Sequence, residues 1–435
     1  MLIKKSLQLS VLVAGVLLAN MASAAVNQCD TALEPLCAKI DAIIKPSELV
    51  GASIALMDGA GKLSYATFNT TPEGEKITPD MKFEIGSISK TFTAARILQL
   101  IDEGKITFDT AISEVLPPSE VTFSQELPGS LTIGNLLRMD NGLYDYAASY
   151  RIMSRDLSAF WPMRYMTSGG YIPNDKEPKV GQLCYGSTGT LLLGLVIDKL
   201  NGGNGLGKEP LVKSLHEGVL KPAGLENTHM GGYEDVFPIS SCTNTNYFDT
   251  VQNTPPKRCP NSESYLFTGN GTSPRDSKTA YLSYAGPAGG MISTSGDIAR
   301  WFNWLFTQGP GAKMTERTAL IGERLSDSDP MITWTKCNQD PWPYPDPKLK
   351  KLEYGLTLEI STLQYGDKPV KVYSFTGGSM SFSSYVLYIP ELKTSASILF
   401  NNLNNPTEKF PHATIVEITS IADLIIEHAV MGGKK

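Results

Sequence analysis

A serine and a lysine stand three residues apart in Gly86-Ser87-Ile88-Ser89-Lys90. The apolar positions that follow at helical spacing are Ala94, Ile97, Leu98 and Ile101. The same spacing counted backwards places Ser87 and Lys90 on this apolar stripe, so both are expected to point inward. Desolvation lowers the pKa of a lysine, and a neutral amine can then accept the proton of a neighbouring hydroxyl. At a helix N-terminus, which favours developing negative charge, the pair predicts an activated nucleophile.

Two further motifs have weaker chemical meaning by themselves. Tyr185 lies just before a second helical pattern, in Tyr185-Gly186-Ser187, and could move a proton if Lys90 lowered its pKa. Phe375-Thr376-Gly377-Gly378 ends a strand-like run, where glycines allow backbone N–H groups to approach a bound carbonyl. Each short motif also arises by chance, so each has a structural alternative. The alternatives are a solvated helix end for Ser87 and Lys90, a structural tyrosine for Tyr185, and an ordinary strand end for 375–378.

The elements that must position these motifs lie at both ends of the chain. Turn residues separate pairs of strand-like runs, which predicts hairpins and antiparallel pairing. The runs are 50–58 and 62–68 near the beginning, and 354–360, 370–375, 381–389 and 395–400 near the end. Helical patterns at 30–44 and about 414–430 can cover the resulting sheet. Between them, 111–345 is helical and rich in loops, and it includes a long polar loop at 231–285.

The composition of the 435-residue chain is that of a globular protein, with 41% hydrophobic and 19% charged residues. Lys4 and Lys5 precede an apolar run, and Ala22-Ser23-Ala24 resembles a cleavage site, so residues 1–24 are expected to be a signal peptide. Its removal changes the net charge from −6 to −8, since 38 − 2 − 44 = −8. An exported, mildly acidic protein without a membrane anchor or a nucleic-acid partner is therefore expected, in the periplasm or outside the cell.

Six cysteines in an exported chain predict disulfides, although sequence cannot select among the pairings. Cys242 and Cys259 share the loop 231–285 and are the first expected pair. Cys29 and Cys37 would be about 12 Å apart on a continuous helix, so they can pair only if the chain turns back between them. No cluster with metal-ligand spacing is present, and neither a metal nor a cofactor is expected.

The order of these pieces resembles the serine beta-lactamase and penicillin-binding protein superfamily, in its branch of class C beta-lactamases, D-alanyl-D-alanine carboxypeptidases and family VIII esterases. Ser87-Ile88-Ser89-Lys90 matches the first family motif, Tyr185-Gly186-Ser187 is similar to Tyr-x-Asn, and Phe375-Thr376-Gly377 takes the place of Lys/His-Thr-Gly. Four further segments are similar to family signatures in the right order: 131–143, 221–225, 289–294 and 354–356. The resemblance covers about residues 45–405.

This resemblance implies an α/β (α+β) fold, with an antiparallel sheet domain (25–110 and 346–435) flanked by terminal helices and a mainly helical inserted lobe (111–345). It also implies that Ser87 is acylated, that Lys90 and Tyr185 transfer protons, and that the backbone N–H groups of Ser87 and Gly378 form the oxyanion hole. Ser187, Phe375, Thr376 and Gly377 would line the substrate site. Two of them depart from the family pattern, because Ser187 replaces an asparagine and Phe375 replaces a basic residue.

Three functions remain open. An exported serine hydrolase that cleaves an ester or amide of a small molecule or peptide, as an esterase or a D-amino-acid peptidase does, agrees best with these residues. A class C-like beta-lactamase or D-alanyl-D-alanine carboxypeptidase is the second, and a non-catalytic binding protein is the third. The few histidines lie outside the motifs and no Gly-x-Ser-x-Gly is present, which disfavours a Ser-His-Asp triad.

One aromatic-rich segment could define the substrate pocket. It contains Tyr144, Tyr146, Tyr150, Phe160, Trp161, Tyr165 and Tyr171. Some of these side chains are expected to line an apolar acyl pocket, and packing in the core is the alternative for each of them.

Overall fold

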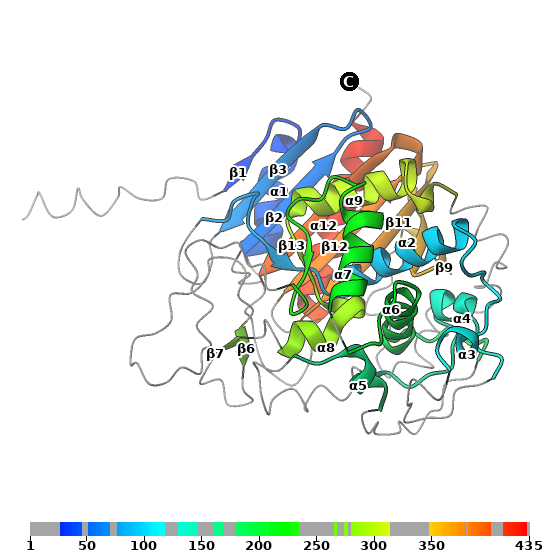
Figure 1. Cartoon of the computed structure of the whole chain (residues 1–435). Coiled ribbons are helices and arrows are strands. Elements are labelled where there is room, and N and C mark those ends of the chain that lie inside the picture. Colours follow the sequence, from blue (N-terminus) through cyan, green and yellow to red (C-terminus); the bar gives the residue numbers. More distant parts are fainter. Residues whose placement is uncertain are drawn as a thin grey trace, which may run out of the picture.

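The structure is a computed structural model, and it describes residues 27–45, 51–69, 76–117, 129–146, 160–168, 180–206, 208–234, 265–267, 274–276, 280–313, 348–379, 382–401 and 412–432. Eight antiparallel strands form its main sheet, in the order β1-β3-β2-β13-β12-β11-β10-β9 (Figure 1). These are β1 (Gln28–Cys29), β2 (Gly51–Met57), β3 (Leu63–Asn69), β9 (Leu349–Gly355), β10 (Leu358–Tyr365), β11 (Lys368–Gly378), β12 (Ser383–Ile389) and β13 (Thr394–Asn401). The predicted hairpins and the antiparallel sheet are confirmed.

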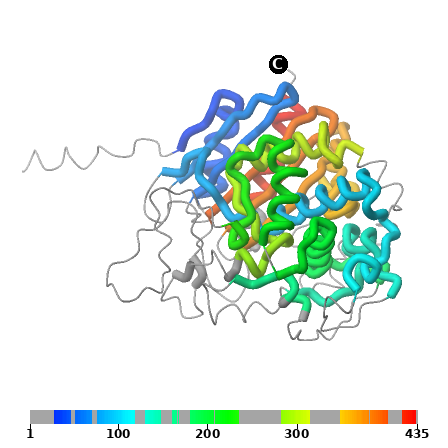
Figure 2. Tube along the Cα trace, viewed as in Figure 1, coloured from blue at the N-terminus to red at the C-terminus, as the bar shows by residue number. Residues whose placement is uncertain are grey.

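The two ends of the chain meet in this sheet. β2 pairs with β13, so the first and last thirds of the chain lie side by side (Figure 2). Helices α1 (Glu34–Ile44) and α12 (His412–Met431) contact each other, and α12 packs on β12 and β13. Their apolar side chains share one core with those of the sheet, including Ile40, Ile398 and Ile421. The prediction of helices at both termini that cover the sheet is therefore confirmed.

The remaining helices gather on the opposite side of the sheet (Figure 1). They are α2 (Ser89–Asp102), α3 (Ile112–Val115), α4 (Ile133–Arg138), α5 (Met163–Ser168), α6 (Thr188–Leu200), α7 (Glu209–Leu215), α8 (Ala280–Gly289) and α9 (Ser295–Thr307). Small sheets are formed by β4 (Phe83–Glu84), β8 (Met291–Ser293) and β5 (His229–Met230), and by β6 (Tyr265–Phe267) with β7 (Pro274–Asp276). Helix α2 lies at the centre of this side, and it packs against α6 and α8.

Helix α9 belongs with the main sheet in space, although its sequence falls in the range predicted for the inserted lobe. It contacts β2, β13 and β12. Small hydroxyl side chains allow this close approach, since Ser295 bonds Ser53 at 2.8 Å and Ser397 donates to the Ser295 carbonyl at 2.6 Å. The helix therefore closes the main sheet on the side where α2 lies.

The sequence predicted a single strand over 354–360, and this prediction is wrong. β9 ends at Gly355 and β10 begins at Leu358, with a tight turn at Leu356 and Thr357. Both turn residues have positive φ, of 38° and 65°. Neither residue is a glycine or an asparagine, so ordinary turn signals are absent and the sequence reads as continuous strand.

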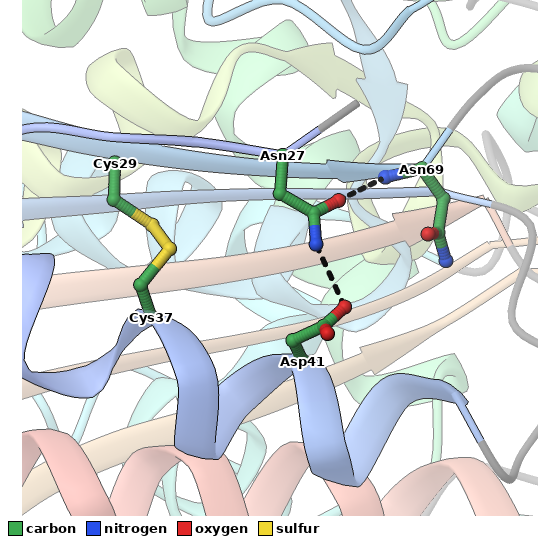
Figure 3. Close-up of a disulfide and its surroundings, with 5 residues drawn as sticks. All are labelled: Asn27, Cys29, Cys37, Asp41 and Asn69. Atoms are coloured by element: carbon green, nitrogen blue, oxygen red, sulfur yellow. Dashed lines mark hydrogen bonds between the residues drawn. A yellow bond between two sulfur atoms is a disulfide. The ribbon is translucent and has the colours of Figure 1, made fainter. Parts of the chain in front are cut away.

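A disulfide joins Cys29 to Cys37 (Figure 3). The chain turns back between β1 and α1, which brings the two Cα atoms to 6.2 Å and meets the condition that the sequence set for this pair. Beside it, the Asn27 amide donates to Asp41 of α1 at 2.7 Å and accepts from the backbone of Asn69 at 3.2 Å. The expected pair, Cys242 and Cys259, lies outside the described residues.

Two further properties of the described residues bear on the sequence predictions. None of their helices is long and apolar enough to cross a membrane. One group of side chains has the proximity of metal ligands, namely Cys29, Glu34 and Cys37. Its two sulfur atoms are bonded to each other in the disulfide, so they are not available as thiolate ligands.

Candidate active site

Ser87 and Lys90 lie together at the beginning of α2. A short 3-10 turn, Gly86–Ile88, leads into the helix, and the amine of Lys90 is 2.9 Å from the hydroxyl of Ser87. Ser87 is half-buried, whereas Lys90 is only 1% exposed. The structure therefore places the two side chains together on the inward face that the periodicity predicted, with the serine the more exposed of the two.

The second partner of Lys90 comes from a kinked helix. Lys90 donates to the carbonyl of Ala288 at 2.8 Å, and Thr93 donates to that of Pro287 at 2.8 Å. Gly286 breaks the helical geometry of α8 with φ 48°, and Pro287 follows it. Because α8 ends at Gly289, the carbonyls of Pro287 and Ala288 lie in its last turn and have no partner N–H further along the helix, so they accept from α2 instead.

Burial controls the protonation of Lys90. It lowers the pKa of the amine to about 8, against a smaller opposing effect of the Asp145 carboxylate. About one molecule in ten then carries a neutral amine at neutral pH. A lysine in this state can accept a proton from the Ser87 hydroxyl, which agrees with the sequence prediction.

Tyr185 approaches the same pair from the loop before α6. Its hydroxyl is hydrogen-bonded to Ser87, and its ring centroid lies 5.1 Å from the Lys90 nitrogen. The sequence predicted a tyrosine whose pKa Lys90 would lower, but the pKa of Tyr185 is raised. Burial is the largest cause, and it outweighs the hydrogen bond from Ser87. In the resting site Tyr185 is therefore a phenol, able to give a proton but not poised as a phenolate.

The loop at 144–146 holds the start of α6 and so fixes Tyr185. Asp145 accepts from the backbone N–H of Ser187 at 3.1 Å. Thr188 accepts from the N–H of Tyr146 at 2.9 Å and donates to the carbonyl of Tyr144 at 2.6 Å. Ser187, predicted to bind substrate, is half-buried at this junction.

The end of β11 forms the other wall beside Ser87. A side chain on Gly86, which has φ 49°, would meet the backbone of Gly378 at 2.4 Å, so the two backbones are in direct contact. A side chain on Gly377 would meet the carbonyl of Ile85 at 2.0 Å. Both positions therefore require glycine, which brings the N–H groups predicted for the oxyanion hole, those of Ser87 and Gly378, onto adjacent backbone segments.

Phe375 and Thr376 differ in their exposure on this strand. Phe375 is 2% exposed and belongs to the apolar core on the α2 side of the sheet, which Tyr373 and Phe382 share. Thr376 is half-buried. The position at which the family motif has a basic residue is thus filled by an apolar side chain in a packed environment.

Sequence reasoning missed two acidic residues near this site. Asp145 acts on the charges of both Lys90 and Tyr185, and buried Glu359 of β10 acts on Tyr185. A signal for Glu359 existed, because a lone acid between Leu358 and Ile360 in a strand-like run is unusual in a buried strand. Asp145 gave no such signal, since a polar loop residue after 131–143 is ordinary.

The aromatic segment predicted to form an acyl pocket is only partly described. Tyr146 is 2% exposed, donates to the carbonyl of Tyr284 at 2.9 Å and accepts, through its own carbonyl, from the hydroxyl of Tyr284 at 2.5 Å. These bonds identify Tyr146 as a packing residue. Phe160, Trp161 and Tyr144 are half-buried, so part of each side chain stays accessible, as the lining of a pocket requires. Tyr150, Tyr171 and the side chain of Tyr165 lie outside the described residues.

A cavity of about 480 Å³ lies elsewhere, between α2, α6 and α7. Its lining includes Arg96, Glu103 and Glu217, and the Arg96 guanidinium is 2.7 Å from the Glu103 carboxylate. None of the candidate catalytic side chains lines it. This cavity is therefore separate from the site built around Ser87.

Comparison with known proteins gives the family context of this site. A beta-lactamase from Providencia stuartii is 24% identical over 393 residues, which is 83% of this chain and 86% of that protein. Penicillin-binding protein 4 from Amycolatopsis lactamdurans is 29% identical over 171 residues, covering 38% of this chain and 42% of that protein.

Among solved structures, a D-amino acid amidase from Ochrobactrum anthropi complexed with L-phenylalanine amide has a similar fold. The TM-score is 0.65 at 18% identity, and the alignment covers 93% of this chain and 100% of the amidase chain. The sequence pattern of the beta-lactamase family matches residues 38–419, a range that contains Ser87, Lys90, Tyr185 and the end of β11. The chain therefore belongs to the beta-lactamase family.

Proposed function

We propose that this family member is a serine hydrolase that cleaves esters or amides of small molecules through an acyl intermediate on Ser87. The observation that carries the proposal is the 2.9 Å contact between the Ser87 hydroxyl and the Lys90 amine, whose pKa burial lowers to about 8. A non-catalytic relative would have no need to bury a lysine against a serine, because burial of an amine whose hydrogen-bond partners carry no charge is costly.

The proton transfers follow from the contacts of these residues. Neutral Lys90 takes the Ser87 proton as the serine oxygen attacks the substrate carbonyl, and the N–H groups of Ser87 and Gly378 stabilise the oxyanion. Tyr185, a phenol in the resting site, protonates the leaving alcohol or amine and regains a proton from the protonated Lys90, since Ser87 is then acylated and has none to give. A water molecule then attacks the acyl-serine, and Lys90 takes its proton and returns it to the Ser87 oxygen as the ester bond breaks and the acid is released.

The walls of the site favour acyl groups without an anionic substituent. Phe375 offers no positive charge, and Asp145 places a negative charge near Lys90 and Tyr185. A substrate carboxylate would lose its hydration without gaining an ion pair, at a cost of a few kcal/mol. Neutral esters and amides, and those with a free amine as in amino acid amides, meet no such penalty. The fold shared with a D-amino acid amidase supports this choice.

A beta-lactamase or D-alanyl-D-alanine carboxypeptidase is the second candidate, and the family match and the Providencia stuartii relative support it. Export is also part of the proposal, on the signal-like pattern of residues 1–24. Turnover of p-nitrophenyl butyrate, an amino acid amide, a cephalosporin and a peptide ending in D-Ala-D-Ala separates the candidates. The first two are expected to be cleaved faster. A higher kcat/KM for the cephalosporin would overturn the choice of substrate class.

A further inference from the structure

Glu359 is a buried acid that the proposed chemistry does not use. It is 8% exposed and lies at the start of β10. The strand register places it opposite Ser374 of β11 on one side and Tyr354 of β9 on the other. The Ser374 hydroxyl donates to its carboxyl at 3.5 Å, at the outer limit of a hydrogen bond. A polar row of three side chains thus crosses three neighbouring strands.

This row lies at the point where β11 loses its pairing with β10. The pairing of β10 with β11 stops at Glu359 and Ser374, whereas the pairing of β12 with β11 continues to Gly378. The residues predicted to line the substrate site, Phe375 to Gly378, begin directly after Ser374. Glu359 therefore lies at the base of the open edge along which a substrate would bind.

Backbone strain marks the same hairpin. Among the described residues, five that are not glycine have positive φ, and two of these, Leu356 and Thr357, form the turn just before Glu359. A third, Met139 at the end of α4, contacts Tyr354 of the same hairpin. Thr357 donates to the carbonyl of Leu137 at 3.0 Å, and the Tyr354 hydroxyl donates to the sulfur of Met139 at 3.2 Å. Such conformations cost free energy and tend to gather at functional sites.

The strained hairpin is connected to Tyr185 through the end of α4. The Met139 carbonyl accepts from the N–H of Cys184 at 2.8 Å, one residue before Tyr185. The contact of Tyr354 with Met139 thus links the β9–β10 hairpin to the loop that presents Tyr185. These contacts fix Glu359 and Tyr185 in relation to each other.

The charge of Glu359 matters to its neighbours. Burial raises its pKa to about 8, so the carboxyl is protonated at neutral pH. When ionised, it raises the pKa of Tyr185 and of Tyr354. The Asp145 carboxylate, in the 144–146 loop, also raises the pKa of Tyr185. The other polar groups nearby are the Lys90 amine of α2, beside the Tyr185 ring, and the neutral Ser374 hydroxyl of β11, beside Glu359. Ionisation of Glu359 would therefore add a second negative charge beside a site that must build an oxyanion.

We propose that Glu359 is a positioning residue of the catalytic site, which must stay protonated for Tyr185 to release its proton to the leaving group and for the oxyanion to form. The inference rests on the proposed function of Ser87. It implies that acylation slows in alkaline solution because Glu359 loses its proton. The role is indirect, since Glu359 acts through Tyr185 and through the potential at the open edge of β11.

The test measures the rate at which a fluorophosphonate labels Ser87 as a function of pH, in the full chain. Glu359→Gln keeps the shape of the side chain and cannot ionise. The wild-type rate is expected to fall above about pH 8, and the variant is expected to hold its plateau, so that the two rates differ about tenfold one pH unit above that pKa. At neutral pH they should agree within about threefold.

Two further variants complete the design. Ser374→Ala removes the hydroxyl that favours the ionised carboxyl, and it should move the alkaline fall to higher pH. Glu417→Gln, which alters another acid whose pKa burial raises, lies on α12 and should leave the wild-type profile unchanged. An infrared band of a protonated carboxyl at neutral pH, absent in Glu359→Gln, reports the same state without turnover.

The outcomes separate this inference from the proposed function. Labelling of Ser87 with the same alkaline fall in wild type and Glu359→Gln would overturn the role of Glu359 alone. A rate lowered equally at every pH would also overturn it, because that is the mark of a purely structural residue. Absence of any labelling at Ser87 would instead contradict the proposed function. If Glu359→Gln does not fold, the shift in Ser374→Ala decides the matter.

Discussion

The Lys90 amine lies 2.9 Å from the Ser87 hydroxyl, one helical turn along α2, and it is almost completely buried there. Tyr185 joins the pair from a different element, with its hydroxyl bonded to Ser87 and its ring beside the amine. One hydroxyl thus has two proton-transfer partners. Their functions are predicted to depend on each other, because both act on the same proton.

The first prediction concerns this dependence. Lys90→Ala and Tyr185→Phe should each lower kcat/KM for an ester by about two to four powers of ten, the usual range for loss of general acid–base catalysis. The double variant should be little worse than either single one, since the residues act as a unit. A double-mutant cycle on kcat/KM measures this. Losses that multiply fully would show that Lys90 and Tyr185 work independently.

The second prediction is the pH dependence of acylation below neutrality. Burial lowers the pKa of Lys90 to about 8, so its basic form increases as pH rises towards that value. Between about pH 6 and pH 7, the rate of acylation should increase nearly tenfold, in proportion to the neutral amine. Stopped-flow acylation with an activated ester tests it. A rate independent of pH in this range would mean that Lys90 is not the group that must lose a proton.

A third prediction uses Phe375 to exchange substrate classes. Phe375→His or Phe375→Lys should raise the ratio of kcat/KM for anionic substrates over neutral esters by about ten- to a hundredfold, because a cation would then pair with the carboxylate. Phe375→Leu is the matched control, which keeps the site apolar and should leave the ratio unchanged. All three variants need a melting curve, since Phe375 is packed in the core. An equal ratio in all variants would remove Phe375 from the account of specificity.

Loss of the Cys29–Cys37 disulfide is predicted to lower stability and to leave activity unchanged. Replacing both cysteines by serine should lower the free energy of unfolding by about 2–3 kcal/mol, the expectation for a short closed loop. The bridge joins β1, at the edge of the sheet, to α1. The value of kcat/KM at low temperature should therefore stay within about twofold of wild type, as expected for a change outside the site. A large loss of activity at temperatures where the variant is folded would contradict this separation.

Local patterns in the sequence predicted most of the sheet and the Ser87–Lys90 pair, because these depend on period and spacing. The 354–360 segment was misread because Leu356 and Thr357 form a turn in left-handed conformations that their residue types disfavour. The raised pKa of Tyr185 was missed for a different reason. Burial around its hydroxyl is produced by segments far apart in the chain, and no local pattern reports it.

Asp145 and Glu359 illustrate the same limit. The positions of both acids relative to Tyr185 depend on how α4, the 144–146 loop and the β9–β10 hairpin pack together. A sequence shows that such residues are acidic, but the folded chain determines which charges they act on. Gly377 was expected to let backbone N–H groups approach a bound carbonyl, and in the folded chain it lets β11 approach the carbonyl of Ile85, a contact between distant segments that no local pattern reports.

The central claim is that Ser87 becomes acylated with help from Lys90. Intact-mass spectrometry after treatment with a fluorophosphonate tests it most directly, with Ser87→Ala and Ser89→Ala as paired variants. Wild type and Ser89→Ala are predicted to gain one adduct, located at Ser87 by peptide mapping, while Ser87→Ala gains none. An adduct of undiminished yield in Ser87→Ala, or no adduct in the wild type, would contradict the account.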